Sequence, residues 1–288
     1  MKPFRLVSSL ILVTILSANA SFAQSKTRLG DNAALRYWSA FAQMQDFAIS
    51  EQQAKELNSI LAGTAPYDDS KYKDLAENNR PAVETMARGT TLPTCDWGIE
   101  YGLREGAPVD FVRKALTLGR LNTLFAFHLM QTGDQGGAVR TLAAGMHFSR
   151  DVANGGSLFA TVVAKDLLAI HLGAMDFLMH SKQLSASQTS LLRAAVADSG
   201  SEGVDWQSAV RLEMEVLNRP DWHGSGAVES VTQAYTAALK DPALLPKLQQ
   251  AIASAPQQLR DAVPNPQRVL EEQKDLHEKL ARMRSRLQ

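Results

Sequence analysis

Hydrophobic residues recur at helical spacing along most of the chain, and this pattern predicts an all-α protein. In the first such stretch, Leu35, Trp38 and Phe41 lie three residues apart, which places them on one face of a helix over 32–47. No segment alternates β-branched and polar residues as a half-buried strand does. The same spacing predicts further helices over 51–62, 68–89, 108–132, 135–153, 158–181, 186–198, 203–218, 227–239, 242–254 and 267–287.

Capping residues mark where several of these helices begin and end. Ser50 with Gln53, and Ser185 with Gln188, match capping boxes, and Gly133 is a typical helix stop. Short connections join the helices in the centre of the chain, so consecutive helices are expected to pack antiparallel. The predicted fold is an array of antiparallel helical hairpins, organised as an α-solenoid or as an irregular helical bundle.

Changes in composition divide the chain into a signal segment over 1–23, the hairpin array over 24–218 and C-terminal helices over 219–288. Pro81 is expected to kink or split the third helix, and residues 90–108 are expected to form a packed loop. The last helix carries an apolar stripe, which favours a helix docked on the rest of the chain over a dimerising zipper. The stripe consists of Leu276, Leu280, Met283 and Leu287.

The helix predicted over 158–181 is apolar nearly all round, as in a membrane span or the buried centre of a helical protein. It also contains Lys165, Asp166, His171 and Asp176. Each charge at the centre of a span costs about 2.5–3.5 kcal/mol on insertion scales. The sequence therefore favours a central core helix, and no membrane span is expected in the mature chain.

A pattern of small and large residues marks the predicted hairpin over 118–148. Its members are Phe125, Ala126, Leu129, Gly133, Asp134, Ala138, Leu142 and Gly145. The pattern resembles one tetratricopeptide unit, in which small residues lie where the paired helices touch. Asn122 stands where that family usually has a large aromatic residue, and no second clear copy is present. The broader prediction of a hairpin array does not depend on this resemblance.

Two short motifs, NAALRYW at 32–38 and TCDWG at 94–98, precede the long helical region. In this order they resemble a group of exported bacterial all-helical proteins, over about residues 30–217. The resemblance implies a helical fold and export. It implies no activity, cofactor or site residue.

The first 23 residues have the order of a secretory signal peptide: Lys2 and Arg5, then an apolar stretch of about 11 residues, then small residues. A membrane-spanning helix needs roughly 20 apolar residues. Cleavage is expected before Gln24, with Ser21 as the alternative first residue. No Cys follows either position, so the mature chain is expected to be soluble in the periplasm or outside the cell, without a lipid anchor.

Composition narrows the classes of partner. The whole chain is neutral, and loss of Lys2 and Arg5 with the signal takes the mature chain to −2, so nucleic-acid binding is not expected. Cys95 is the only cysteine, which excludes an intrachain disulfide. A buried free thiol is favoured over a disulfide between two chains.

Standard catalytic and nucleotide-binding motifs are absent from the sequence, so no cofactor is expected. The strongest candidates for chemistry are Asp166, His171 and Asp176 in the central helix. Asp176 and His180 are four residues apart and share a face, so they can pair, but two ligands from one helix are too few for a metal site. Asp166 and His171 are five residues apart and do not share a face.

Lys165 and Asp166 need partners in a buried helix, because an unpaired buried charge costs several kcal/mol. Partners are expected on neighbouring helices, among Arg140, Arg150, Arg211, Glu213 and Glu215. Trp206, Trp222 and His223 are candidates for binding sugars or peptide side chains. The more common role of such tryptophans is to pack a loop onto a helix end.

These features favour a non-enzymatic exported protein that presents a groove or face to another protein or to an envelope component. The alternative is a hydrolase or lyase in which Asp166, His171 and Asp176 lie near a cleft. A third hypothesis is assembly through the C-terminal helix. A deep pocket into which at least two of the three candidate side chains converge would favour the enzyme, whereas internal pairing would favour the binding protein.

The exported form is predicted to begin at Gln24. Mass spectrometry of the protein recovered outside the cytoplasm of an expressing bacterium is expected to give a chain of 265 residues, since 23 of the 288 are removed. Recovery of the intact chain, still carrying its apolar start, would contradict this prediction.

Overall fold

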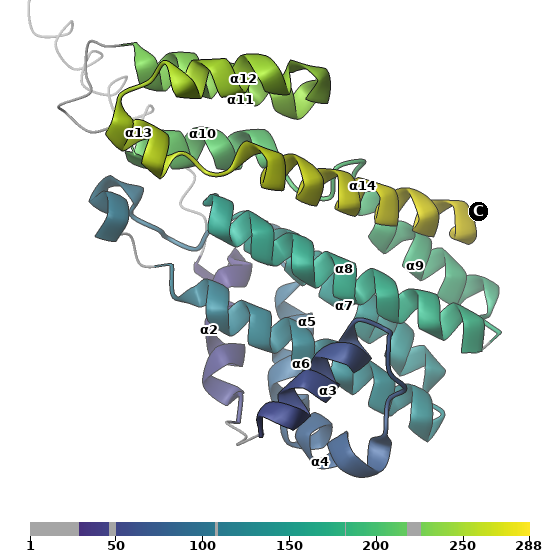
Figure 1. Ribbon diagram of the computed structural model, residues 1–288. Helices are drawn as coiled ribbons and strands as arrows, with labels where there is room; N and C mark the ends of the chain where they lie inside the picture. The colour runs from purple at the N-terminus through teal and green to yellow at the C-terminus, as the bar shows by residue number, and fades with distance from the viewer. Residues whose placement is uncertain (1–28, 46–49, 107–108, 182, 218–225) are drawn as a thin grey trace, which may run out of the picture.

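The computed structural model (Figure 1) describes residues 29–45, 50–106, 109–181, 183–217 and 226–288. Throughout these residues the regular secondary structure is helical, apart from an isolated β-bridge between Asn32 and Thr94. The predicted all-α class is therefore confirmed. The segment predicted as a signal over 1–23, together with Trp222 and His223, lies outside the described residues.

Most helices have bounds within a few residues of those predicted. In chain order they are α2 (Ala33–Gln43), α3 (Glu51–Leu61), α4 (Asp69–Asn78), α5 (Arg80–Gly89), α6 (Phe111–Thr132), α7 (Gln135–Ala153), α8 (Leu158–Ser181), α9 (Ala186–Asp198), α10 (Trp206–Leu217), α11 (Ala227–Lys240), α12 (Leu245–Ala253), α13 (Gln257–Ala262) and α14 (Pro266–Leu287). Short 3₁₀ helices are η1 (Leu29–Asp31), η2 (Tyr101–Gly106) and η4 (Pro242–Leu244).

Prolines mark two features of the helix bounds. The helix expected over 68–89 is split, as predicted, into α4 and α5 at Asn79, and Pro81 lies in the first turn of α5, where its missing N–H costs nothing. No helix was predicted between residues 254 and 267, where Pro256 and Pro264 lie. This segment contains the short helix α13, because six residues between prolines are enough for one and a half turns.

Three long helices, α6, α7 and α8, form the centre of the molecule, and each contacts the other two. α6 ends at Gly133, whose φ of 87° is in the left-handed region that favours glycine. The carboxylate of the next residue, Asp134, then accepts a hydrogen bond of 2.8 Å from the backbone N–H of Gly137 and caps α7. This tight turn makes α6 and α7 an antiparallel hairpin, as predicted.

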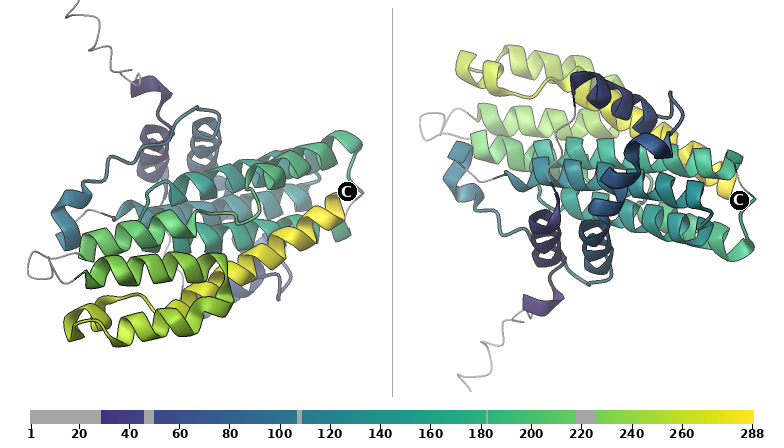
Figure 2. Two further views of the ribbon diagram at one scale, coloured as in Figure 1. Left: turned by 90° about the horizontal axis from the view of Figure 1, so that it is seen from above. Right: turned by 90° about the horizontal axis from the view of Figure 1, so that it is seen from below.

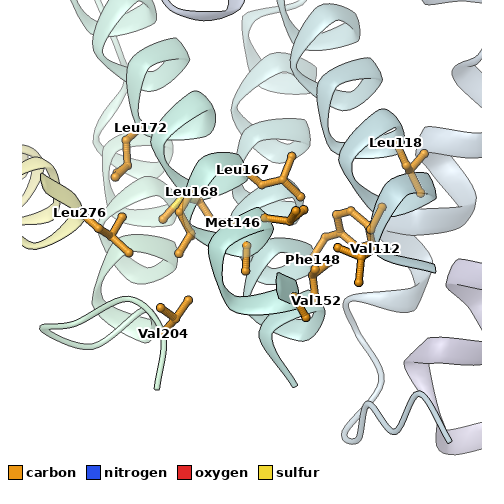
Figure 3. Close-up of a cluster of buried hydrophobic side chains, with 14 of the residues drawn as sticks. Val112, Leu118, Met146, Phe148, Val152, Leu167, Leu168, Leu172, Val204 and Leu276 are labelled. Carbon is orange, nitrogen blue, oxygen red and sulfur yellow. The ribbon is translucent and has the colours of Figure 1, made fainter. Parts of the chain in front are cut away.

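The hydrophobic core runs from α6 through α7 and α8 to α14 (Figure 3). Leu118, Phe148, Leu167 and Leu276 represent these four helices in turn, and all four side chains are fully buried. The helices approach closely enough that a Cβ at Gly119 would lie 2.4 Å from a methyl carbon of Leu167. Such interdigitation is typical of well-packed protein interiors.

Two groups of helices flank this centre (Figures 1 and 2). α2, α4 and α5 pack against α6 or α7, whereas α10 and α14 pack against α8, with α14 also contacting α9. α3 lies across α6 and α8. The apolar stripe of α14 is buried within the chain, so the docked C-terminal helix predicted from the sequence is confirmed: Leu276, Leu280, Met283 and Leu287 are each at most 3% exposed.

The segment predicted as a packed loop is held by its two aromatic side chains, as expected. The Nε1 of Trp97 donates a hydrogen bond of 2.7 Å to the backbone carbonyl of Asp151, and the Tyr101 hydroxyl donates to the carbonyl of Gly155. Cys95 is half-buried beside the same Asp151 carbonyl. Burial raises the pKa of the Cys95 thiol, which keeps it protonated and weakly reactive.

Among the described residues, α8 is the helix long and apolar enough to cross a membrane. In this fold 67% of its most apolar stretch is buried, in contact with α6, α7, α10 and α14. The core helix of a globular helical protein meets the same criteria of length and composition. These criteria alone are therefore weak grounds for assigning a span.

Gly145→Ala is predicted to destabilise the fold. A Cβ at this position would lie 2.4 Å from the Asn122 Nδ2 and from the His171 Nε2, two buried atoms that are hydrogen-bonded to each other. We expect the free energy of unfolding to fall by about 1–3 kcal/mol in urea denaturation.

Gly173→Ala is the matched control, because no atom lies within 4 Å of the Cβ that it would add. Its expected effect is a gain of up to about 1 kcal/mol from helix propensity. Similar stabilities for the two variants would show that α6, α7 and α8 do not pack as closely as described.

Candidate functional site

A groove with a cavity volume of about 780 Å³ lies between α3, α8 and α14. Asp166, Ile170, Gly173 and Asp176 of α8 recur at intervals of three or four, so they form one face of that helix. α14 contributes Lys279, Arg282, Met283 and Arg286 in the same way, α3 contributes Asn58 and Leu61, and α6 contributes Arg120. A cavity of this size is typical of ligand-binding sites.

The lining of the groove is rich in positive charge. Its cations outnumber its carboxylates, which are Asp166 and Asp176. The cations are Arg120, Lys165, Lys279, Arg282 and Arg286. Apolar side chains from all three walls lie between these charges. The lining of the groove therefore combines apolar surface with an excess of cationic side chains.

Lys165 is the most deeply buried of the cations, with a side chain only 9% exposed. Its ammonium group bonds to Glu272 and lies 3.1 Å from Asp275, both on α14, and 3.6 Å from Asp166. Burial alone would lower the pKa of Lys165, but the hydrogen bonds to Glu272 and Asp275 outweigh burial and raise it. Lys165 is therefore a neutralised anchor for α14.

The partners expected for Lys165 and Asp166 were wrong. The structure pairs Lys165 with α14, about a hundred residues away in sequence, because α14 lies along α8. The expected partners lie on helices that are closer in the chain. In the described structure none of them pairs with Lys165 or Asp166; they were Arg140, Arg150, Arg211, Glu213 and Glu215.

The cations of α14 also have carboxylate partners. Lys279 lies 2.6 Å from Asp275, and Arg282 lies 3.8 Å from Glu278. Arg286 pairs with Asp176 of α8. The first two pairs lie within α14, whereas the third connects α14 to α8 at the far end of the groove; all three cations stay partly exposed.

Asp176 and His180 form the pair predicted from their spacing, with 3.6 Å between the carboxylate and the ring Nδ1. Arg286 joins them, because its guanidinium also lies 2.7 Å from His180 Nε2. Among the described residues, no group of three or more His, Cys, Asp or Glu has a geometry that could hold a metal ion. The pair is thus part of an ion-pair cluster at the end of α8.

Arg120 differs from every other cation in the groove. No hydrogen bond or ion pair to it is found in the described part of the chain, and its Nε is buried without a partner. Arg120 is close enough to lower the pKa of Asp166, although it does not reach ion-pair distance. Burial is the larger effect on that carboxyl and raises its pKa overall.

The three candidate catalytic residues do not form one site. Asp166 and Asp176 line the groove, but they are ten residues apart on one helix, which corresponds to about 15 Å. Two carboxylates that act on one glycosidic bond lie about 5–9.5 Å apart. His171 is fully buried between Asn122 of α6 and Ser149 of α7, so its predicted place near a cleft is wrong.

His171 is held as a neutral ring. Ser149 donates its own proton to the Gly145 carbonyl, so its oxygen accepts from His171 Nδ1, while Asn122 donates to His171 Nε2. Burial lowers the pKa of His171 to about 4. This histidine is a polar connection between three helices.

The structure also bears on the residues that were predicted to bind sugars or peptide side chains. Trp206 is 2% exposed, and its buried Nε1 has no hydrogen-bond partner, so its ring is not available as a surface for a ligand. Trp222 and His223 lie outside the described residues. Arg120 was not among the predicted candidates. Its position in the sequence could have indicated it, since it is the only Asp, Glu, Lys or Arg between Lys114 and the end of α6.

The buried neutral His171 predicts a loss of stability in acid. Its pKa is about 4 when folded and about 6.5 when exposed, so the unfolded chain binds the extra proton as the pH falls below 6.5. The stabilisation present above pH 6.5 is then lost progressively down to about pH 4. At about 1.4 kcal/mol per pH unit the loss is about 3 kcal/mol.

Urea denaturation between pH 7 and pH 4.5 measures this effect. The unfolding free energy of His171→Gln is expected to fall less steeply with acid than that of the wild type. His277→Gln, at a position whose side chain is 50% exposed, is the control for replacing a histidine at the surface. A His171→Gln slope equal to that of the wild type would mean that His171 is not buried as a neutral ring.

The comparisons with known proteins leave the groove to be interpreted from its own chemistry. No protein-family model matches the chain, and neither a curated protein nor a solved structure matches it.

Proposed function

We propose that this chain is an exported, non-enzymatic binding protein that holds an anionic component of the cell envelope in the groove between α3, α8 and α14. The observation that carries the proposal is the groove itself, with its 780 Å³ volume, apolar walls and excess of cations. Apolar surface around a few convergent charged groups is the usual composition of a ligand site. The groove is large enough for a small molecule or for a short segment of another protein.

Export is part of the proposal. The signal segment over 1–23 directs the chain out of the cytoplasm, and the mature protein begins at Gln24. It then acts in the periplasm or beyond. The envelope therefore supplies the partners that the mature chain meets.

The hairpin array gives this binding protein its surface. The α6–α7 hairpin corresponds to the single tetratricopeptide-like unit. Gly145 supplies the small residue where α7 meets Asn122 of α6 and His171 of α8. Short connections from α6 to α9 support a stacked arrangement. Stacked hairpins leave an extended face, along which α14 lies.

Binding is favoured over catalysis by the state of the candidate catalytic groups. His171 is sealed in the core, Asp176 is paired with Arg286, and Glu272, the second carboxylate near Asp166, is bound to Lys165. General acid–base catalysis usually needs such a partner to be free and within reach of the same bond.

A hydrolase or lyase is the second candidate, and one observation favours it. The half-exposed Asp166 lies in the groove with a pKa raised by burial, which is the direction that suits a general acid. This candidate requires that the wild-type chain convert a bound molecule and that Asp166→Asn abolish the conversion.

Charge reversal in the groove tests the proposed function. Arg282 and Lys274 both lie on α14 and both pair with Glu278, at 3.8 and 3.9 Å, but only Arg282 lines the groove. The wild type, Arg282→Glu and the control Lys274→Glu are each incubated with a detergent-solubilised envelope fraction. Mass spectrometry then quantifies the anionic components that each protein retains.

Arg282→Glu is expected to retain at least about tenfold less of the component, because it replaces an attractive charge with a repulsive one. Lys274→Glu should retain as much as the wild type. Equal retention by all three proteins would contradict binding in the groove. Release of a chemically changed component by the wild type, but not by Asp166→Asn, would favour the enzyme instead.

A further inference from the structure

A second, smaller cavity adjoins the groove beneath α3. Its volume is about 140 Å³, and Leu57 of α3 with Leu121 and Leu124 of α6 give it mainly apolar walls. Asn58 and Arg120 line both this cavity and the groove, so the two spaces meet at these side chains. An engineered apolar cavity of about 150 Å³ binds benzene, so a space of this size admits a hydrocarbon group of about six carbons.

Arg120 stands at this junction without a partner of its own. The other cations that line the groove, on α8 and α14, each have a carboxylate within 4 Å, and Arg120 has none in the described residues. Its guanidinium is half-buried, and its Nε is shielded from solvent. A half-buried guanidinium is a strong site for a carboxylate or phosphate, which it can bind through two parallel hydrogen bonds.

We propose that Arg120 binds the head group of an anionic amphiphile whose hydrocarbon part enters the cavity beneath α3. The ligand class is a carboxylate or phosphate attached to an alkyl chain, as in a fatty acid or an acyl lipid. This inference rests on the proposed function and specifies the ligand of the same groove. A free inorganic anion would satisfy Arg120 but leave the adjoining apolar cavity unused.

The walls of the two spaces support this orientation of the ligand. Ile170 and Met283 extend the apolar surface into the groove, whereas the cavity beneath α3 has no charged side chain apart from Arg120 itself. An alkyl chain in the cavity buries its own apolar surface together with that of Leu57, Leu121 and Leu124. The head group is then held at Arg120, the lining cation that has no carboxylate within 4 Å in the described residues.

The test is titration calorimetry of the full chain without its signal segment, using four matched probes. Octanoate carries both the charge and the chain, octanamide lacks the charge, and acetate lacks the chain. Octyl phosphate carries the other head group. We expect octanoate or octyl phosphate to bind at least about tenfold more tightly than octanamide and acetate, and the tighter of the two identifies the head group.

Two variants separate the contributions of charge and cavity. Arg120→Met removes the charge but keeps the aliphatic stem, so it should lower the affinity for the tighter anion by at least about tenfold and leave octanamide unchanged. Arg113→Met is its control, because Arg113 is an exposed arginine seven residues earlier on α6 that lines neither space. Ala54→Leu, which fills the cavity, should weaken every probe that has an alkyl chain.

Thermal melting checks that each variant folds. Arg120→Met is expected to melt no lower than the wild type, because it removes a half-buried charge that has no partner in the protein. A lower melting temperature would point to a structural role for Arg120 and would overturn the inference.

Two further outcomes would overturn it. One is an absence of binding by both anionic probes, and the other is equal binding of octanoate and octanamide by the wild type. If either occurs while retention of an envelope component still depends on Arg282, only the amphiphile is excluded and the proposed function stands. If neither Arg120 nor Arg282 affects any binding, both proposals fail.

Discussion

Lys165 places an ammonium group on the most apolar helix of the chain, and the architecture of the groove depends on how that charge is compensated. Carboxylates on α14, at Glu272 and Asp275, surround a side chain that is only 9% exposed. Breaking a buried ion pair by removing one partner typically costs 3–5 kcal/mol. α14 is therefore fixed along α8 by this cluster as well as by its apolar stripe, and one wall of the groove is fixed with it.

α14 lies along α8 in a register that places opposite charges together at both ends of the groove. Lys165 and Asp176 are eleven residues apart on α8, and their partners Asp275 and Arg286 are eleven residues apart on α14. Equal separations along parallel helices correspond to equal distances of about 16 Å. The sign of the charge is reversed at the second pair. The groove occupies the interval between these two ion pairs.

Local signals were sufficient to predict the helices, and they failed where the fold brings distant segments together. Both hydrogen bonds of the capping box at Ser185 and Gln188 are present, because a cap is a contact between residues three apart. The bond from Lys165 to Glu272 joins residues 107 apart, and helical periodicity does not reveal which helix lies beside which. The two aspartates of the groove were recognisable because they are ionisable residues in an otherwise apolar helix. Arg120 was not recognisable from the sequence, because what distinguishes it is the lack of a partner for its guanidinium in the described residues.

Two buried ionisable side chains of α8 are stabilised in different ways, and Arg120 of α6 follows neither. His171 is kept neutral, with both ring nitrogens hydrogen-bonded to side chains of α6 and α7. Lys165 is kept charged and is surrounded by carboxylates. Arg120 keeps its charge without a partner, and a guanidinium cannot be neutralised by losing its proton. Natural sequences tolerate such local conflicts mainly at functional sites, where a ligand supplies the missing contact. The cations of α14 are held by carboxylates, whereas the one on α6 without such a partner is the site that we propose for the anion.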